Sequence, residues 1–381
     1  FFAFLFAIFF AKKIRQASLF TIPEKLTESY GKKTGLLSAL IVFVLVLPAP
    51  YLLMSANLLS LVFDTNILIS LTITLMLSGS YLVKGGFRSN VYADAFQFFI
   101  MFLGFGLIFI FCFSGYGGLS FLDSNLPASH LKLTGDASPM FLIIWFLIAM
   151  WTFADPGFHQ RAYAAKSGEI AKKGLLISIL FFALFDLLTT STGLYAKAIL
   201  PDLNQPINSF PLLAEKVLSP GAKGVFYAAL FATIISTLNS FLFLSATTIS
   251  RDFIFKLTNY PENKTRYYTM IGILTSGFIS IIIAYLIPSV IEIWYTIGSL
   301  FIPAIILPVV GAYYPKFKVP DKIVLYQMSG TLLITFAWFL LRDSWKGSFI
   351  YDIEPMIIGL TFSLIIQFLG LFFKSFFSYK R

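Results

Sequence analysis

The chain has 381 residues, of which 58% are apolar and only 12% charged, with a mean hydropathy of +0.84 and a net charge of +10. Soluble domains carry about 25% charged residues, so this composition excludes a soluble globular protein and indicates a polytopic membrane protein. The single cysteine, Cys112, excludes a disulfide framework within the chain, and two histidines make a zinc or haem site a poor interpretation.

Long continuous apolar runs predict transmembrane helices of about 20 residues rather than the short alternating strands of a barrel. The first eleven residues are too few to span a bilayer, and we interpret 1–11 as a partial helix, the end of a span that begins before Phe1. The sequence is expected to form one transmembrane domain over 1–381. Ten full spans are predicted at 34–63, 66–83, 92–114, 138–154, 173–198, 222–250, 267–287, 290–313, 322–341 and 354–374.

The connections between these spans alternate in charge. All but six of the 28 Lys and Arg residues lie in 12–33, 84–88, 158–173, 251–266, 314–322 and 374–381. The positive-inside rule predicts that these segments, including the C-terminus, face the cytoplasm of a cell membrane. The basic residues are dispersed and no nucleic-acid-binding motif accompanies them, so topology explains the positive charge and nucleic acid is not an expected partner.

Motifs of enzymes and ATP-driven pumps do not occur in the sequence. There is no GxxxxGK[ST], G-x-S-x-G or H-E-x-x-H, so the chain is predicted to be neither an ATPase nor an enzyme.

Four acidic residues lie in or beside predicted spans, where ionisable groups commonly mark transport pathways. Asp186 is in mid-span, and this position allows two interpretations. The residue is either part of a cation or gating site, or an acid that is hydrogen-bonded to a neighbouring helix. Asp94, with Gln97 one turn on, and Glu292 lie near span starts, where the helix dipole also favours a carboxylate. Asp155, in the stretch WTFADPGFHQRAYAAKS, precedes a proline and a glycine that should bend or end a helix.

A stripe of hydroxyl groups runs along the span 222–250. Thr233, Ser236, Thr237 and Ser240 recur at three- and four-residue spacing, which places them on one helix face. Hard cations such as sodium take oxygen ligands, so the stripe predicts a cation site. Small and hydroxyl residues also line ordinary helix contacts in membranes, and the pattern alone leaves both interpretations open.

Four stretches resemble segments of the sodium:solute symporter family. They are LFTIPEKLTESYG (19–31), YLVKGGFRSNVYADAFQ (81–97), DPGFHQRAYAAKS (155–167) and ISTLNSFLFLSATTISRD (235–252). The family segments are TLPEFLxxRFG, GGxxAVxWTDxxQ, QRxxAAKS and STxxSxxLxxSxxxxxD, and the four occur here in the same order. The resemblance implies an all-α, leucine-transporter-like bundle of two inverted repeats, with the first core helix missing from the sequence.

The resemblance also implies roles for particular residues. Ser236 and Thr237 match a pair that binds sodium in such symporters, and Thr233 matches a third position that is usually a small residue. Asp94 matches an aspartate implicated in ion coupling. The region of Trp151, Thr152 and Phe153 lies near the centre in relatives, where Trp151 would stack on or gate a solute unless it serves only packing.

We therefore expect a symporter that uses sodium as coupling ion, without a cofactor, to import a small organic solute by alternating access. The alternatives are a proton-coupled transporter of the same fold, with Asp94 or Asp186 carrying the proton, and a non-transporting membrane sensor.

Overall fold

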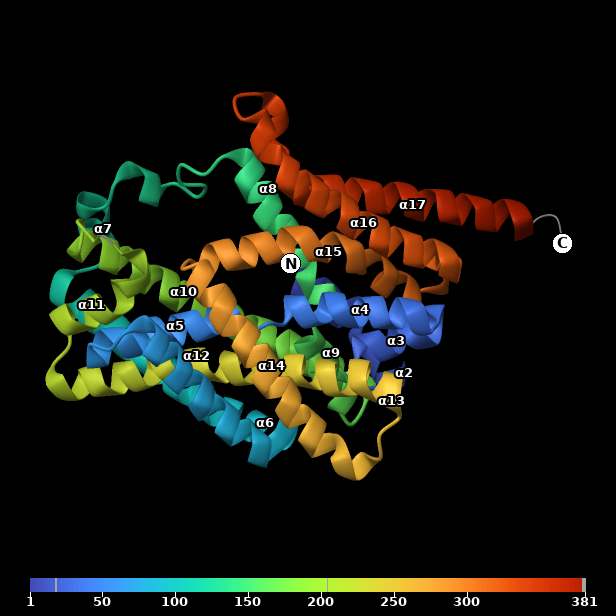
Figure 1. Ribbon diagram of the computed structural model, residues 1–381. Helices are drawn as coiled ribbons and strands as arrows, with labels where there is room; N and C mark the ends of the chain where they lie inside the picture. Colours follow the sequence, from blue (N-terminus) through green and yellow to red (C-terminus); the bar gives the residue numbers. More distant parts are fainter. Residues whose placement is uncertain (18, 204, 379–381) are drawn as a thin grey trace.

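The computed structural model describes residues 1–17, 19–203 and 205–378; within these, the side chains of 81, 83–89, 262, 349 and 376–378 are not described. These residues form helices and no strand, which confirms an all-helical protein (Figure 1). The α-helices are α1 (Phe2–Phe9), α2 (Ala11–Ala17), α3 (Ile22–Tyr30), α4 (Lys32–Leu45), α5 (Ala49–Phe63), α6 (Ile67–Tyr116), α7 (Leu119–Asn125), α8 (Pro139–Ile148), α9 (Pro156–Ala164), α10 (Gly168–Ile199), α11 (Ser209–Val217), α12 (Pro220–Thr247), α13 (Lys256–Thr258), α14 (Thr265–Leu286), α15 (Val290–Tyr313), α16 (Asp321–Leu341) and α17 (Pro355–Ser378).

Within the described residues, nine helical segments are long and apolar enough to cross a membrane. A tenth, Ile67–Ser80, is apolar but shorter than the others, in the region where a full span was predicted at 66–83. The protein is therefore a multi-pass membrane protein. Of the basic residues expected to face the cytoplasm, the side chains of Lys84, Arg88, Lys380 and Arg381 lie outside the described part.

Connections rich in Lys and Arg lie at the opposite end of the bundle from connections that are poor in these residues. In Figure 1, α2, α3 and α13, which belong to the Lys- and Arg-rich segments 12–33 and 251–266, lie at one end, and α7 and α11 lie at the other. The connection 12–33 is mostly helical rather than an irregular loop, because α2, α3 and the start of α4 occupy it. Local chemistry explains α3: Thr21 is its N-cap and accepts a hydrogen bond from the amide of Glu24 at 3.1 Å.

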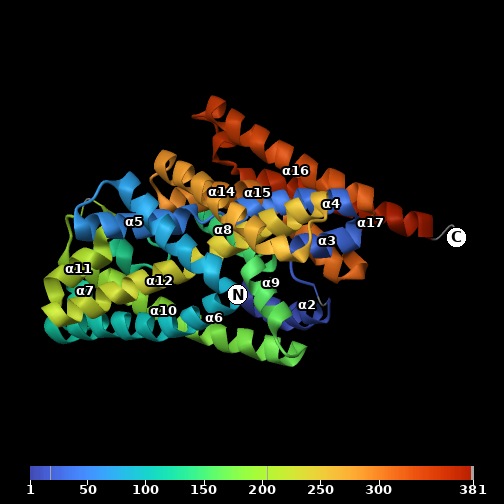
Figure 2. The same cartoon turned by 60° about the horizontal axis from the view of Figure 1, so that its bottom comes forward.

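Helix α6 reverses direction although it is hydrogen-bonded as one element. Leu71 shares a core cluster with Leu238, and Leu82 shares one with Ala246, so the first half of α6 runs parallel to α12. Further along α6, contacts move back down α12, from Ser240 at Asn90 to Ala229 at Gly104. The predicted loop at 84–88 is thus a turn of helical backbone, and both views show α6 doubling back (Figure 2).

Two predicted spans are interrupted at prolines and an acid. The span 34–63 is divided into α4 and α5 at Pro48, which lacks an amide donor. The span 138–154 ends as α-helix at Ile148 and continues as the 3₁₀ helix η2 (Ala149–Phe153). Asp155 then caps a new helix, α9, with Pro156 in its first turn, so the residues from 158 to Ala164 are helical and not the expected loop.

Helix α12 lies in the middle of the bundle and is approached closely by its neighbours (Figure 2). A Cβ atom at Gly104 of α6 would lie 2.1 Å from the Cβ of Ala229, and one at Gly272 of α14 would lie 2.5 Å from the carbonyl oxygen of Ala246. These glycines allow the backbones to meet, as small residues do at helix contacts in membranes.

Replacement of Gly272 by alanine is predicted to destabilise the protein, because the new methyl group meets backbone that cannot rotate away. Overpacking of this kind costs about 1–3 kcal/mol. Gly106→Ala is the matched control, since nothing lies within 4 Å of its Cβ position. Thermal unfolding in detergent should show a lower apparent Tm for Gly272→Ala only. Equal Tm values for the two variants would contradict the close packing.

Candidate functional site

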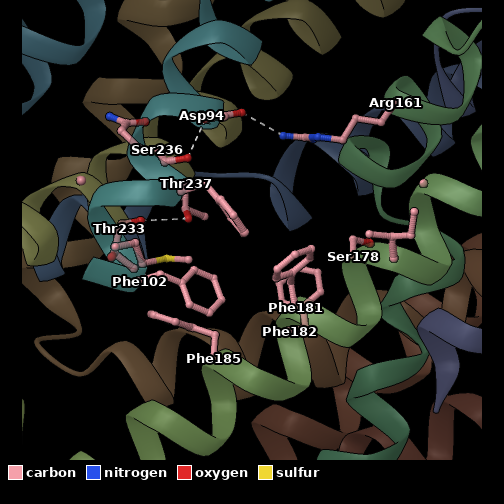
Figure 3. A pocket seen from close by; sticks show the side chains of 16 residues that line it. Asp94, Phe102, Arg161, Ser178, Phe181, Phe182, Phe185, Thr233, Ser236 and Thr237 are labelled. Carbon is pink, nitrogen blue, oxygen red and sulfur yellow. Dashed lines mark hydrogen bonds and ion pairs between the residues drawn. The ribbon is translucent and has the colours of Figure 1, made fainter. Parts of the chain in front are cut away.

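A carboxylate and a hydroxyl group from two different helices meet inside the bundle. Oδ1 of Asp94 on α6 accepts a hydrogen bond from Oγ of Ser236 on α12 at 2.6 Å (Figure 3). Asn90, one turn earlier on α6, donates from Nδ2 to Oδ2 of Asp94 at 3.3 Å and to Oγ of Ser240 at 2.8 Å. The antiparallel packing of the second half of α6 on α12 therefore joins the predicted aspartate to the predicted hydroxyl stripe.

Arg161 supplies the positive charge at this cluster. Its Nη2 atom lies 3.1 Å from Oδ2 of Asp94, and its Nη1 atom donates to the carbonyl oxygen of Gly157 at 3.3 Å. The side chain of Asp94 is 20% exposed and that of Arg161 is 49% exposed. A half-exposed guanidinium contributes modestly to stability, so the pair is better suited to exchange partners than to hold the fold. Nothing in the sequence around Arg161 points to its partner Asp94, 67 residues earlier in the chain, so the sequence analysis missed this ion pair.

Thr233 and Thr237 line the same cavity as Asp94 and Ser236, which has a volume of about 520 Å³. Thr233 donates its hydroxyl hydrogen to the carbonyl of Ala229 at 2.8 Å, and Thr237 donates to the carbonyl of Thr233 at 3.3 Å. This back-bonding uses the hydrogen of each hydroxyl and leaves its oxygen lone pairs available. The structure thus brings the three predicted sodium-binding residues and Asp94 to one cavity.

Aromatic rings also line this cavity (Figure 3). Phe98 and Phe102 of α6 meet Phe181 and Phe185 of α10, with ring centroids 5.2 Å and 5.3 Å apart for the pairs 98–181 and 102–185. Phenyl rings among the oxygen atoms make the surroundings of Asp94 less polar than water, so electrostatic attraction between a cation and this carboxylate is stronger than in water.

Two amide oxygens near Asp94 are buried without a hydrogen-bond partner among the described residues. They are Oδ1 of Asn90, a residue only 3% exposed, and Oε1 of Gln97, which lines the cavity. Buried polar atoms are normally satisfied, and an oxygen left without a donor is a candidate ligand for a cation. Asn90 was missed from the sequence, although its position four residues before Asp94 places it on the same helix face.

Asp186 is not part of this cluster. It is exposed on α10 and does not line the cavity, although Phe185 beside it does. Glu292 lies in the first turn of α15, whose N-cap Ser289 accepts from the Glu292 amide at 3.3 Å. That position agrees with the helix-start interpretation of Glu292.

A second cavity, of about 350 Å³, lies where α5, α8, η2, α12 and α15 meet, and Trp151 and Thr152 line it. Phe153 does not, because its ring is turned toward the N-terminal helices. It packs against Phe6 and Phe10 with centroid separations of 6.5 Å and 5.2 Å. The structure thus places two of the three predicted solute-contacting residues beside a cavity and packs the third against the apolar core.

The first and fourth sequence stretches meet in a polar network at the Lys- and Arg-rich end. Thr21 donates to Oδ1 of Asp252 at 2.7 Å, and Asp252 is fully buried in the π-helical turn η4 (Thr248–Phe255) that continues α12. Nζ of Lys256 lies 3.9 Å from Oδ1 of Asp252 and donates to Oγ1 of Thr27 at 2.7 Å. Arg251 pairs with Glu24 at 2.8 Å. These bonds fix α3 to the end of α12.

Tyr30 anchors the other end of α3. Its hydroxyl donates to the carbonyl oxygen of Pro308 on α15 at 3.2 Å, and burial raises the pKa of Tyr30, with the Asp321 carboxylate adding to the effect. The hydroxyl therefore stays protonated and remains a donor at physiological pH.

Replacement of Lys256 by methionine is predicted to lower stability, because Asp252 would keep a buried carboxylate without its neighbouring cation. Removing one partner of a buried pair costs about 3–5 kcal/mol, and the 3.9 Å separation places this case toward the lower end. Lys264→Met, at an exposed position nearby, is the matched control. The measurement is the apparent Tm in detergent; a Tm loss no larger than that of the control would show that Lys256 does not stabilise the network.

The sequence model of the sodium:solute symporter family matches residues 1–318. The chain therefore belongs to the sodium:solute symporter family, whose members are transporters and not enzymes. The family expected from the four stretches is confirmed.

Curated relatives include two symporters of known type. The chain is 27% identical over 279 residues to the sodium/pantothenate symporter of Escherichia coli, covering 68% of this chain and 58% of that protein. It is 24% identical over 306 residues to the sodium/proline symporter of Staphylococcus aureus, covering 76% of this chain and 59% of that protein. The chain thus spans less than two thirds of the length of these relatives.

Among solved structures, the chain resembles a Na⁺-coupled sialic acid symporter in a substrate-bound outward-open state. The TM-score is 0.77 at 16% sequence identity, over 97% of this chain and 81% of that one. At this identity the match establishes the fold, and it confirms the helical transporter bundle expected from the sequence.

Proposed function

We propose that the protein is a sodium-coupled secondary transporter that imports a small organic solute across the cell membrane by alternating access. The observation that carries the proposal is the contact of Asp94 with Ser236 in a cavity that Thr233 and Thr237 also line. A carboxylate within a membrane bundle is costly and is found mainly where it serves an ion or proton pathway. Membership of a family of sodium symporters supports the same conclusion.

The cluster has the chemistry to bind sodium as cargo. Asp94 provides the negative charge, and Ser236, Thr233 and Thr237 provide neutral hydroxyl oxygens, which suit a hard monovalent cation and suit a transition metal poorly. Sodium at Asp94 would compete with the Arg161 guanidinium for the same carboxylate oxygens. Binding of the ion would therefore loosen the contact between α6 and α9. The proposal includes no bound cofactor, because the sodium gradient supplies the driving force.

The proposed solute site is the second cavity, where Trp151 and Thr152 lie on the interrupted segment between α8 and α9. Broken helices at the midplane are the usual place for solute binding in transporters built from inverted repeats. Asp155 and Arg161 follow on the same segment, so a solute that moves η2 would also move Arg161 relative to Asp94. This gives a physical route from the solute cavity to the ion cluster.

Sodium binding provides the direct test. Binding of ²²Na⁺ to the purified protein should weaken at least tenfold in Asp94→Asn and in Ser236→Ala, because each change removes an oxygen ligand or its charge. Asp123→Asn, at an exposed site on α7, is the control for loss of a carboxylate, and Asp186→Asn examines the other acid singled out from the sequence. Unchanged binding in Asp94→Asn would overturn the proposed site.

The coupling ion is tested separately by uptake into proteoliposomes at fixed pH, with sodium replaced by choline. Sodium-dependent uptake supports the proposal. Uptake that persists in choline and follows a pH gradient would instead assign proton coupling, with Asp94 as the carrier. Neither uptake nor ion binding would point to the non-transporting sensor.

The Lys- and Arg-rich end of the bundle is proposed to face the cytoplasm, following the positive-inside rule. Single cysteines test this, because the native Cys112 is fully buried. An impermeant maleimide added to intact cells should label Ser124→Cys on α7 and should label Asn263→Cys only after permeabilisation; both positions are exposed. The reverse pattern would invert the proposed orientation.

A further inference from the structure

The break between η2 and α9 leaves one backbone carbonyl without its helical donor. In a continuous helix the carbonyl of Phe153 would accept from the amide of residue 156 or 157. Pro156 has no amide hydrogen, and the amide of Gly157 donates to Oδ1 of Asp155 at 2.6 Å instead. The Nε2 atom of His159 takes the vacant place and donates to the carbonyl oxygen of Phe153 at 2.9 Å. Asp155 and His159 thus satisfy the two backbone groups that the break releases.

His159 extends this contact into a chain of hydrogen bonds. A carbonyl oxygen can only accept, so Nε2 carries the imidazole hydrogen and Nδ1 of the neutral ring is an acceptor. The hydroxyl of Tyr313, at the end of α15, donates to Nδ1 at 3.4 Å. The hydroxyl of Tyr163, in the last turn of α9, then donates to that of Tyr313 at 2.5 Å. The chain has one direction, from Tyr163 through Tyr313 and His159 to the carbonyl at the break.

Apolar rings seal this chain from water. His159 is fully buried, and Tyr163 and Tyr313 are 8% and 7% exposed. The ring of Phe6 lies edge-on to His159 with centroids 5.4 Å apart, and that of Phe10 lies edge-on to Tyr313 at 5.9 Å. Hydrogen bonds in such surroundings are stronger than in water, and leaving one group without its partner is costly. The break and the contact between α9 and α15 are therefore held by one set of bonds.

The chain ends at a third cavity, of about 300 Å³, at the Lys- and Arg-rich end of the bundle. Tyr163 of α9 lines this cavity, together with Thr247 at the end of α12 and Arg251 of η4. The hydroxyl of Tyr163 is held by Tyr313, which fixes the ring as part of the wall. At the other end of the chain, η2 precedes the break and lines the second cavity. One chain of bonds thus joins the walls of two cavities.

We propose that His159 is a positioning residue of the transporter, and that its chain with Tyr313 and Tyr163 couples the break beside the second cavity to access into the third. With the chain intact, α9 is held against α15 and Tyr163 stays in the wall of the third cavity. When the bond between the two tyrosines breaks, Tyr163 rotates, α9 separates from α15 and the cavity becomes more accessible. The inference rests on the proposed transport function for one step: sodium at Asp94 competes for Arg161, which also lies on α9.

Cysteine labelling measures access to the third cavity without sodium or solute. Thr247→Cys is the reporter, because Thr247 lines the cavity and the native Cys112 is fully buried. In the purified protein, Tyr163→Phe should raise the rate of maleimide labelling at least threefold, since it removes the hydroxyl that joins α9 to α15. Tyr195→Phe is the matched control: Tyr195 is also buried and donates to the carbonyl of Gly117 at 2.5 Å, beside α7 at the opposite end of the bundle. Equal rates in the two variants would overturn the inference.

Replacement of His159 separates a positioning role from general destabilisation. Glutamine has an Nε2 donor that reaches the carbonyl of Phe153, whereas leucine fills the space and donates nothing. His159→Leu should therefore raise the Thr247→Cys labelling rate as much as Tyr163→Phe does, and His159→Gln should raise it less. Adding Tyr163→Phe to His159→Leu should give no further increase, because both changes break the same chain. Additive effects, or equal rates for the glutamine and leucine variants, would remove His159 from the coupling.

Sodium separates this inference from the function on which it rests. Replacing choline by sodium should change the Thr247→Cys labelling rate at least twofold in the otherwise unaltered protein and in Tyr195→Phe. It should not do so in Tyr163→Phe, where the chain is already broken. A sodium effect that persists in Tyr163→Phe, or intact ²²Na⁺ binding with no sodium effect in the unaltered protein, contradicts the coupling. Loss of ²²Na⁺ binding in the unaltered protein rejects the proposed ion site alone, and the sodium-free rates still decide whether the chain controls the third cavity.

Discussion

Three helices of the bundle meet at a carboxylate that needs polar partners in apolar surroundings. Asp94 meets this requirement through Ser236, Asn90 and Arg161, which come from three helices. The contact with Ser236 requires the second half of α6 to lie directly on α12, and Gly104 permits that approach. The reversal of α6, the central place of α12 and the approach of α9 therefore all meet at one partly buried carboxylate.

The two cavities of the proposed transporter differ in their chemistry, which suits the first to an ion and the second to a solute. Oxygen atoms, one carboxylate and one guanidinium group line the first, while aromatic rings line the second. The interrupted segment from η2 to α9 contributes Trp151 to the solute cavity and Arg161 to the ion cluster. A short stretch of the chain thus touches both sites, which is the physical basis on which binding at one would alter the other.

A polar network attaches α3 to η4 at the Lys- and Arg-rich end of the bundle. Thr21, Asp252 and Lys256 join two segments more than 200 residues apart, and each bond satisfies a group that burial would otherwise penalise. The two segments contain the family-like stretches 19–31 and 235–252, and the structure shows that these stretches contact each other. The bonds between these two stretches attach α3 to the end of α12. The hydroxyl stripe, which lies earlier in α12, faces the ion cavity instead.

The sequence by itself determined the helical spans, the alternation of basic connections and the face shared by Thr233, Ser236 and Thr237, because apolar length and helical spacing are local properties. It also singled out Asp94. Only the tertiary structure decided that Arg161 pairs with Asp94 and that Phe153 turns into the core. It alone brought the rings of Tyr51, Trp145 and Trp294 together around one cavity. Helical periodicity specifies which residues share a face, but which faces meet depends on packing between helices distant in the chain.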